Sequence, residues 1–179
     1  MADGEGNTIW TIGHSTHPAD EFVALLDANG IEAVVDVRRF PGSRRLPQFG
    51  SDALRDVLEH HGIAYRWIEA LGGRRRASAA PSPSAWRHPA FAAYADYAES
   101  EEFAEGLFEL TMIAFGIRTA IMCAEAVWWR CHRRIISDVL VSLGVPVEHI
   151  LGAGKVEPHE LAAPARIVHG QLSYAPPEP

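Results

Sequence analysis

Short apolar runs alternate with amphipathic stretches along most of the chain. The apolar runs have the length of strands, and Gly, Pro, Asn or Asp residues stand close to most of them. We expect strands over residues 8–14, 31–38, 63–69, 118–124 and 147–151. The second run contains AVVDV, which leaves little room for a solvated face, so this strand is predicted to be covered on both sides.

Between these runs, apolar residues recur every three or four positions, which predicts amphipathic helices. The expected helices cover residues 18–30, 51–62, 90–99, 100–116 and about 130–143. Ser51 is expected to cap the second helix and Gly62 to end it. The alternation of strands and helices predicts an α/β fold, a single-domain three-layer sandwich with a mainly parallel central sheet.

The remaining segments define the predicted domain limits. Residues 1–7 are expected to be a disordered N-terminus, residues 8–151 the α/β domain, and residues 152–179 a Pro-containing tail that wraps the surface or is partly disordered. Residues 70–90 are rich in Gly, Ser, Pro and Arg and form a long predicted loop. A loop of this length inside a compact domain is typically functional or mobile.

Composition narrows the function classes. With 47% hydrophobic and 22% charged residues the chain is typical of a globular protein, and its net charge of −7 argues against broad binding of duplex nucleic acid. No apolar run approaches the roughly 20 residues that span a bilayer, and the acidic N-terminus is unlike a signal peptide. We therefore expect a cytoplasmic protein without membrane partners, whose two cysteines stay reduced.

The basic residues are unevenly distributed. Fifteen of the sixteen are arginine, and ten fall into three clusters, which span residues 38–45, 74–76 and 130–134. The planar guanidinium fork suits phosphate and carboxylate groups better than a lysine ammonium does. A GC-rich genome would explain the preference for arginine, but it would not explain the clustering.

Polar residues also gather where three predicted strands end. The segments Gly-His-Ser at 13–15, Asp-Val-Arg at 36–38 and Cys-Ala-Glu at 123–125 each follow or close an apolar run. In open parallel sheets the ligand crevice lies at the carboxyl ends of the strands. We therefore expect the functional site at this edge of the sheet.

The stretch IMCAEAVWWRCHRRII, residues 121–136, holds both cysteines of the chain. Cys123 closes a strand, and Cys131 is expected in the first turn of the next helix, where free backbone N–H groups and neighbouring arginines favour a thiolate. The order of strand, loop, arginine and helix resembles in outline the anion cradles of cysteine phosphatases and sulfurtransferases. The six residues between Cys123 and Arg130, which include no glycine, depart from that spacing.

Several segments together resemble a known family. TIGHS, VDVRRFPGSRR, LGGRRR, YADY and MCAEAVWWRCHR are similar, in this order, to the signature segments of the bacterial and archaeal family named domain of unknown function 488. The resemblance covers about residues 8–151. It implies a single α/β domain, and it implies no reaction and no catalytic residues.

Three functions follow from these features. The leading hypothesis is a domain, enzymatic or not, that binds a small anionic or phosphate-bearing ligand such as a nucleotide or a nucleic-acid end. Its expected ligand-binding residues are Ser15, Arg38, Arg44, Arg74, Arg130, Arg133, Trp86 and Trp128, with Trp129 as a further stacking candidate. The second hypothesis is a thiol enzyme of phosphatase or sulfurtransferase type. The third is a non-catalytic adaptor that uses the loop 70–90.

Candidate catalytic groups are the thiols together with nearby acids and bases. They are Cys131, Cys123, His14, Asp36, Glu125 and His132. For several of them a structural role is an open alternative: Cys123 as a core residue, His14 bonded to a backbone carbonyl, and Asp36 paired with Arg38 to organise a loop.

No cofactor is expected, and no metal. His14, Cys123, Cys131 and His132 carry ligand types that zinc or iron accepts, but no short Cys-x-x-Cys pair supports such a site. A disulfide between Cys123 and Cys131 as a redox switch is left open. The oligomeric state is likewise not predicted.

Overall fold

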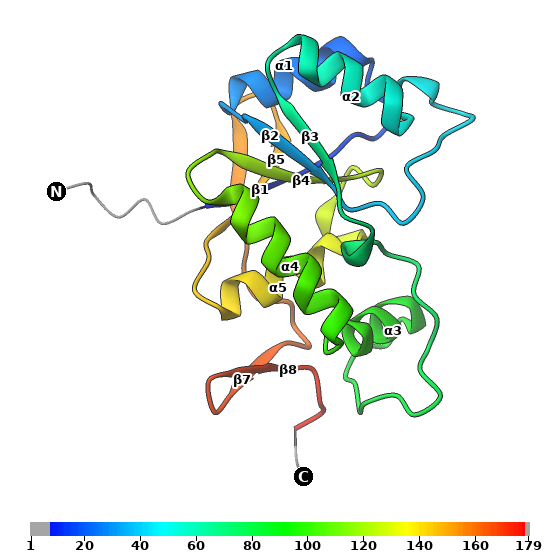
Figure 1. Ribbon diagram of the computed structural model, residues 1–179. Coiled ribbons are helices and arrows are strands. Elements are labelled where there is room, and N and C mark those ends of the chain that lie inside the picture. The colour runs from blue at the N-terminus through cyan, green and yellow to red at the C-terminus, as the bar shows by residue number, and fades with distance from the viewer. Residues whose placement is uncertain (1–7, 178–179) are drawn as a thin grey trace, which may run out of the picture.

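A computed structural model describes residues 8–177 as three layers, with a central sheet between two groups of helices (Figure 1). Within the described residues the sheet has six strands in the order β3-β2-β4-β1-β5-β6. The strands are β1 Ile9–Gly13, β2 Ala33–Asp36, β3 Ala64–Trp67, β4 Thr119–Cys123, β5 Val147–Gly152 and β6 Lys155–Pro158. All neighbouring pairs are parallel except β5 and β6. The predicted α/β class and the mainly parallel sheet are confirmed.

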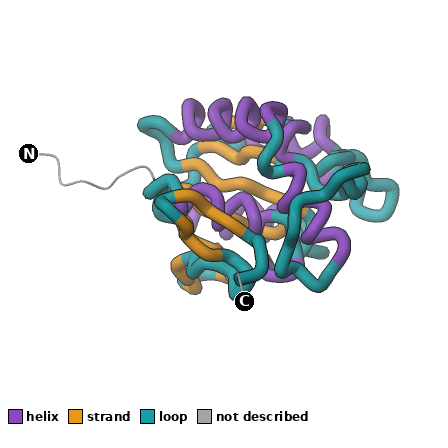
Figure 2. Tube along the Cα trace, turned by 90° about the horizontal axis from the view of Figure 1, so that it is seen from below, coloured by secondary structure: helices purple, strands orange, loops and turns teal. Residues whose placement is uncertain are grey.

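The helices divide between the two faces of the sheet. They are α1 Ala19–Ala28, α2 Ser51–His60, α3 Pro89–Tyr97, α4 Glu101–Ala114 and α5 Arg133–Ser142. Helices α1 and α2 lie on one face, and α3, α4 and α5 lie on the other, so that the strands are enclosed between helices (Figures 1 and 2). Short 3-10 turns occur at Pro47–Phe49, Glu69–Leu71 and Trp128–Arg130.

Two hydrophobic cores hold the layers together, because side chains along each strand point alternately to opposite faces. On β4, Ala120 and Met122 belong to the core under α1 and α2, which also contains Phe22 and Leu54. Ile121 and Cys123 of the same strand belong to the second core, which contains residues of α3, α4 and α5. This covering on both faces explains why β2 and β4 are buried along their whole lengths.

Two local expectations differ from the structure. Ser51 is the first residue of α2, and the N-cap is Gly50, which has no side chain to accept a hydrogen bond. Ser51 is therefore not the capping residue. The segment after residue 151 carries more secondary structure than its sequence indicates: β6 pairs with β5 in the sheet, and β7 Arg166–Val168 forms a hairpin with β8 Gln171–Ser173.

The predicted disordered N-terminus, residues 1–7, lies outside the described residues. Across residues 8–177 every helix is too short or too polar to cross a membrane.

Candidate functional site

The carboxyl ends of β1 and β4 lie side by side, with Gly13 opposite Cys123. The chain leaves β1 toward α1 on one face and leaves β4 toward α5 on the other, so the two connections diverge at this point (Figure 1). Such a divergence creates a crevice in open α/β sheets. The two loops also touch, because a Cβ on Gly13 would lie 1.8 Å from the carbonyl oxygen of Glu125. Position 13 thus accepts only glycine.

A pocket of about 710 Å³ opens at this edge of the sheet. It receives residues from the loops after β1, β2 and β4, from residues 73–74 and from the beginning of α3. Its wall contains His14, Arg38, Arg39, Phe40, Gly42, Ser43, Arg45, Leu46, Gly73, Arg74, His88, Ala90, Phe91, Tyr94, Cys123, Ala124, Glu125, Trp129, Arg130, Cys131 and His132. Five of these residues are arginines, and Glu125 is the one acidic residue of the wall. The pocket wall therefore carries more positive than negative side chains, although Arg38 and Arg39 form ion pairs with Asp36 and Glu69.

An ion pair fixes the loop after β2. Asp36 is fully buried, and its carboxylate accepts hydrogen bonds from Arg38 Nε at 2.9 Å and from the Tyr65 hydroxyl at 2.7 Å. Arg38 also donates from Nη1 to the carbonyl oxygen of Phe49 at 2.7 Å. The guanidinium is thereby held at the pocket wall by a carboxylate and a carbonyl oxygen. Asp36 therefore forms the ion pair with Arg38 that the sequence offered as an alternative to a catalytic role.

His14 lies beside this ion pair in its neutral form. Its Nδ1–H donates to the carbonyl oxygen of Ser15 at 2.8 Å, and its Nε2 faces Nη1 of Arg38 at 3.4 Å as an acceptor. The ring stacks on Phe49 at a centroid distance of 4.1 Å. Burial lowers the pKa of His14 to about 4, and the charge of Arg38 acts in the same direction. This imidazole therefore presents a lone pair, not a charge, at neutral pH.

The two thiols meet at the inner end of the pocket. Cys123 Sγ and Cys131 Sγ are 2.8 Å apart, and both residues are buried, at 2% and 4% exposure. Cys131 follows the 3-10 turn Trp128–Arg130 in an extended conformation, and α5 begins two residues later at Arg133. It is therefore not in the first turn of the helix, as expected, but the backbone N–H of Arg133 still points to its sulfur at 3.5 Å.

The surroundings of the thiols favour one thiolate. Burial raises the pKa of Cys123, and its contact with Cys131 raises it further. Burial opposes charge on Cys131 too, but the hydrogen bond from Cys123 and the charges of His132 and Arg133 bring its pKa well below the usual range. The pair thus ionises at Cys131 and keeps its proton on Cys123.

His132 is held in one orientation toward Cys131. Its Nε2–H donates to the carbonyl oxygen of Val37 at 2.7 Å, which leaves Nδ1 facing Cys131 Sγ at 3.4 Å. A Cβ on Gly73 would lie 2.8 Å from this Nδ1, and the ring of Tyr94 packs edge-on at 5.1 Å. Three segments distant in the sequence therefore fix the imidazole beside the thiol.

Arg133 lies behind the thiols and does not line the pocket. It is 1% exposed; Nη1 donates to Thr11 Oγ1 at 3.2 Å and Nη2 to the carbonyl oxygen of Glu125 at 2.6 Å. Nε is buried without a hydrogen-bond partner. Within residues 8–177 no carboxylate forms an ion pair with this guanidinium, so the thiolate of Cys131 is the negative charge that balances it.

The structure brings most of the predicted site residues together. Eight of them lie in the pocket wall: His14, Arg38, Arg74, Cys123, Glu125, Arg130, Cys131 and His132. Asp36 and Arg133 lie directly behind it and contact wall residues through Arg38 and Glu125. Among the described residues, the wall does not include Ser15, Arg44, Trp86 or Trp128.

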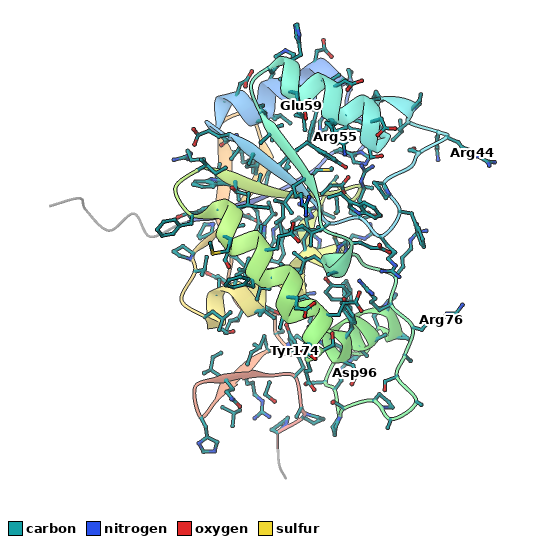
Figure 3. All side chains as sticks on the ribbon, viewed as in Figure 1. Arg44, Arg55, Glu59, Arg76, Asp96 and Tyr174 are labelled. Carbon is teal, nitrogen blue, oxygen red and sulfur yellow. The ribbon has the colours of Figure 1, made fainter. Side chains whose placement is uncertain are left out.

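The four residues outside the wall have other surroundings. Trp86 is buried in the core against Phe91 and Tyr174, so its indole is not free to stack on a base. Trp128 is half-buried and stacks on His149 at 4.2 Å. Arg44 points into solvent at the tip of its loop (Figure 3). Ser15 adopts a positive φ of 48° and contributes its carbonyl oxygen to His14. The predicted ligand contacts of these residues are not supported by their positions.

Sequence reasoning missed several residues of the wall. Arg39, Phe40, Arg45 and His88 were not selected although they line the pocket, where the ring of Phe40 is 67% exposed. Trp129, the further stacking candidate, does lie in the wall, and it is 44% exposed. Gly73 gave a signal in the LGGRRR segment, since paired glycines mark a close approach of backbone to another group. Nothing in the sequence indicates that Arg45, and not its neighbour Arg44, lines the pocket.

A second polar cluster lies beyond Arg133 and was not predicted. Thr11 Oγ1 bonds His149 Nδ1 at 2.7 Å, and His149 Nε2 lies 2.9 Å from His159 Nδ1. His159 then contacts Asp138, whose other oxygen accepts from Tyr174 at 2.7 Å. The chain of contacts connects the site to the segment after β5. Among residues 8–177, no group of three or more His, Cys, Asp or Glu side chains is arranged to hold a metal ion.

These features define an α/β domain with a thiol pair at the bottom of an arginine-lined pocket. The family profile described as domain of unknown function DUF488 matches residues 18–140, well over half of the chain, and the protein belongs to this family. No curated protein and no solved structure gave a significant match to the chain.

Proposed function

We propose that the protein binds a small anionic, phosphate-bearing ligand in the pocket. The observation that carries the proposal is the set of three arginines Arg45, Arg74 and Arg130. All three line the pocket, and none of them forms an ion pair with any of the residues 8–177. Guanidinium groups that face a common cavity without carboxylate partners are suited to a ligand that brings the negative charge.

The conformation of Arg74 supports the same proposal. Arg74 has a positive φ of 56°, a conformation that costs roughly 1–3 kcal/mol in a non-glycine residue. Arg74 follows Gly73 in the sequence, and in this conformation its exposed side chain lines the pocket. Backbone strain of this kind is concentrated at ligand sites because the surrounding structure must maintain it.

The rim also suits a flat group next to the phosphate. Phe40 and Trp129 are exposed aromatic side chains in the pocket wall. Bases stack on such rings with roughly 1–3 kcal/mol per base, which favours a nucleotide or a nucleic-acid end as ligand. A net charge of −7 disfavours long duplex partners. A cytoplasmic location, which the sequence predicts, is part of this proposal.

Thermal melts test the binding. Inorganic phosphate and nucleotides should raise the melting temperature, because a ligand at about 100 times its Kd stabilises the native state by roughly 2.7 kcal/mol. The double variant Arg74→Ala and Arg130→Ala should lose this shift. The matched control, Arg44→Ala and Arg76→Ala, removes two arginines that point away from the pocket and should keep it (Figure 3). Equal losses in both variants would contradict the proposed site.

A second candidate, a thiol enzyme, is favoured by the geometry of Cys131 and His132. A nucleophilic cysteine needs a lowered pKa and a positioned base, and Cys131 has both on the pocket side. Alkylation of the native protein with iodoacetamide across pH tests it. Cys131 should react well below the pH at which an ordinary thiol reacts; labelling only above about pH 8 would argue for binding without thiol catalysis.

A further inference from the structure

Two thiols share the inner end of the pocket, although a single nucleophile would suffice for phosphoryl or acyl transfer. Cys123 comes from the end of β4, and Cys131 is an extended residue two positions before α5. Their sulfurs are in contact at 2.8 Å, and both residues are part of the pocket wall. The second thiol is placed where it can attack the sulfur of the first.

The charges around the pair prepare these two thiols for different steps. Arg133 is buried behind them and donates to a hydroxyl and a carbonyl oxygen, and an unbalanced buried guanidinium is strongly unfavourable. One thiolate, on Cys131, balances this single positive charge. Cys123 remains a thiol until Cys131 becomes neutral, and Arg133 then stabilises negative charge on Cys123.

We propose that the pair is a redox-active dithiol that reduces disulfides of small anionic thiols bound in the arginine pocket. The proposal deepens the binding function above and rests on it for the choice of substrate. A peroxide would need neither a pocket of about 710 Å³ nor a wall with five arginines, whereas a disulfide with carboxylate or phosphate groups makes use of both.

The reaction has two exchange steps. The thiolate of Cys131 attacks one sulfur of the substrate; a bond forms between these sulfurs, and the first half of the substrate leaves as a thiolate. Cys123 then attacks the Cys131 sulfur, the Cys123–Cys131 disulfide forms, and the second half leaves as a thiol with the proton of Cys123. The substrate gains two electrons and the protein loses two, and an external dithiol reductant restores the pair by the reverse exchange.

The number of thiolate equivalents that the wild-type protein releases tests whether the two cysteines act as a dithiol. Dithiobis(nitrobenzoate), an aromatic disulfide with carboxylates, releases a coloured thiolate at each exchange. The reduced native protein should release two equivalents per chain and keep no adduct, and peptide mass spectrometry should find Cys123 linked to Cys131. A stable adduct on Cys131, or one adduct on each cysteine, would overturn the proposal, because Cys123 would then not resolve the intermediate.

Single variants assign the two roles. Cys123→Ser should release one equivalent and retain the adduct on Cys131, whereas Cys131→Ser should react at least about tenfold more slowly, because burial still raises the pKa of the remaining thiol and outweighs the charge of Arg133. Both positions are buried, so each variant is first compared with wild type by thermal melting. Where the serine variant does not fold, the alanine variant replaces it, and the wild-type stoichiometry stands on its own.

The choice of substrate is tested separately from the dithiol. Cystamine, a cationic disulfide, should react about tenfold more slowly than a dicarboxylate disulfide of similar size, and inorganic phosphate should slow only the latter. Equal rates together with two-equivalent release would contradict the anion pocket but leave the dithiol. Phosphate stabilisation together with a stable adduct would contradict the dithiol and leave the binding function.

Discussion

The Nδ1 atom of His132 faces Cys131 Sγ at 3.4 Å, and its Nε2–H donates to the carbonyl oxygen of Val37, the residue after β2. The imidazole therefore cannot turn away from the thiol without losing a hydrogen bond of 2.7 Å. The adjacency of the two residues in sequence does not by itself produce this geometry, since neighbouring side chains commonly diverge. It depends on a backbone group almost one hundred positions earlier.

Replacing His132 with glutamine should make Cys131 a poorer nucleophile. The positive charge that His132 supplies on protonation lowers the pKa of Cys131, so its loss should raise that pKa and shift the alkylation profile to higher pH. We expect the midpoint of the alkylation profile to rise by about one pH unit, so that the rate at pH values below this midpoint falls roughly tenfold. Mass-resolved iodoacetamide kinetics measure it. The control is His88→Gln, another histidine of the wall, which has no thiol contact and should leave the profile unchanged.

Gly73→Ala should impair the same thiol from a distance in sequence. The added Cβ would lie 2.8 Å from His132 Nδ1, closer than real contacts allow, and the ring is restrained by its bond to Val37. The ring must shift, and the rate of Cys131 alkylation should fall severalfold. Gly42→Ala is a matched control in the same pocket wall, because a Cβ there meets nothing within 4 Å. Identical alkylation rates in the two variants would show that Gly73 does not position His132.

The sheet edge that carries the candidate site could be predicted from the sequence, because the apolar runs and the polar residues that follow them are local features. His14, Arg38 and Cys123 come together since β1, β2 and β4 are neighbours and parallel, as a buried α/β pattern indicates. The same reasoning identified the two thiols and the arginine clusters as the chemistry of the chain.

Which member of each cluster faces the pocket could not be predicted, because this depends on the paths of loops and on distant partners. Arg45 lines the wall whereas Arg44 points into solvent, and the two residues are identical and adjacent. Trp86 resembles a stacking residue in a polar loop, but it is buried against Tyr174, which lies in the predicted tail. These outcomes are set by tertiary contacts over many tens of residues.

Tyr174→Phe should destabilise the protein. The Tyr174 hydroxyl donates to Asp138 Oδ2 at 2.7 Å in a buried cluster, and its removal leaves a buried acceptor without this donor. The expected loss is about 1–3 kcal/mol in the free energy of unfolding, measured by urea denaturation. Limited proteolysis should also cut residues 160–177 faster, because Asp138 holds this segment through both Tyr174 and Ala162 N–H. An unchanged urea midpoint would mean that water replaces the hydroxyl at no cost.

Two buried histidines should make the protein less stable in mild acid. Burial lowers the pKa of His14 to about 4 and that of His149 to about 2, from 6.5. Arg38 lowers the pKa of His14 further while Asp36 acts against it. Above pH 6.5 these side chains are neutral in both the folded and the unfolded chain, so they contribute no pH dependence there.

Below pH 6.5 the unfolded chain takes up protons at these histidines and the native protein does not, so the free energy of unfolding falls as the pH falls. The decline should continue to about pH 4 for His14 and further for His149, with a slope of up to about 1.4 kcal/mol per pH unit for each group. Urea denaturation between neutral pH and about pH 5 measures this slope.

The variant His149→Gln removes one of the two titrating groups, so its slope should be smaller than that of wild type even if its stability at neutral pH is lower. His60→Gln, at an exposed position of α2, controls for the loss of a histidine from the unfolded chain. Equal slopes in wild type and His149→Gln would mean that the native protein protonates His149 in this range, contrary to its buried position between Thr11 and His159.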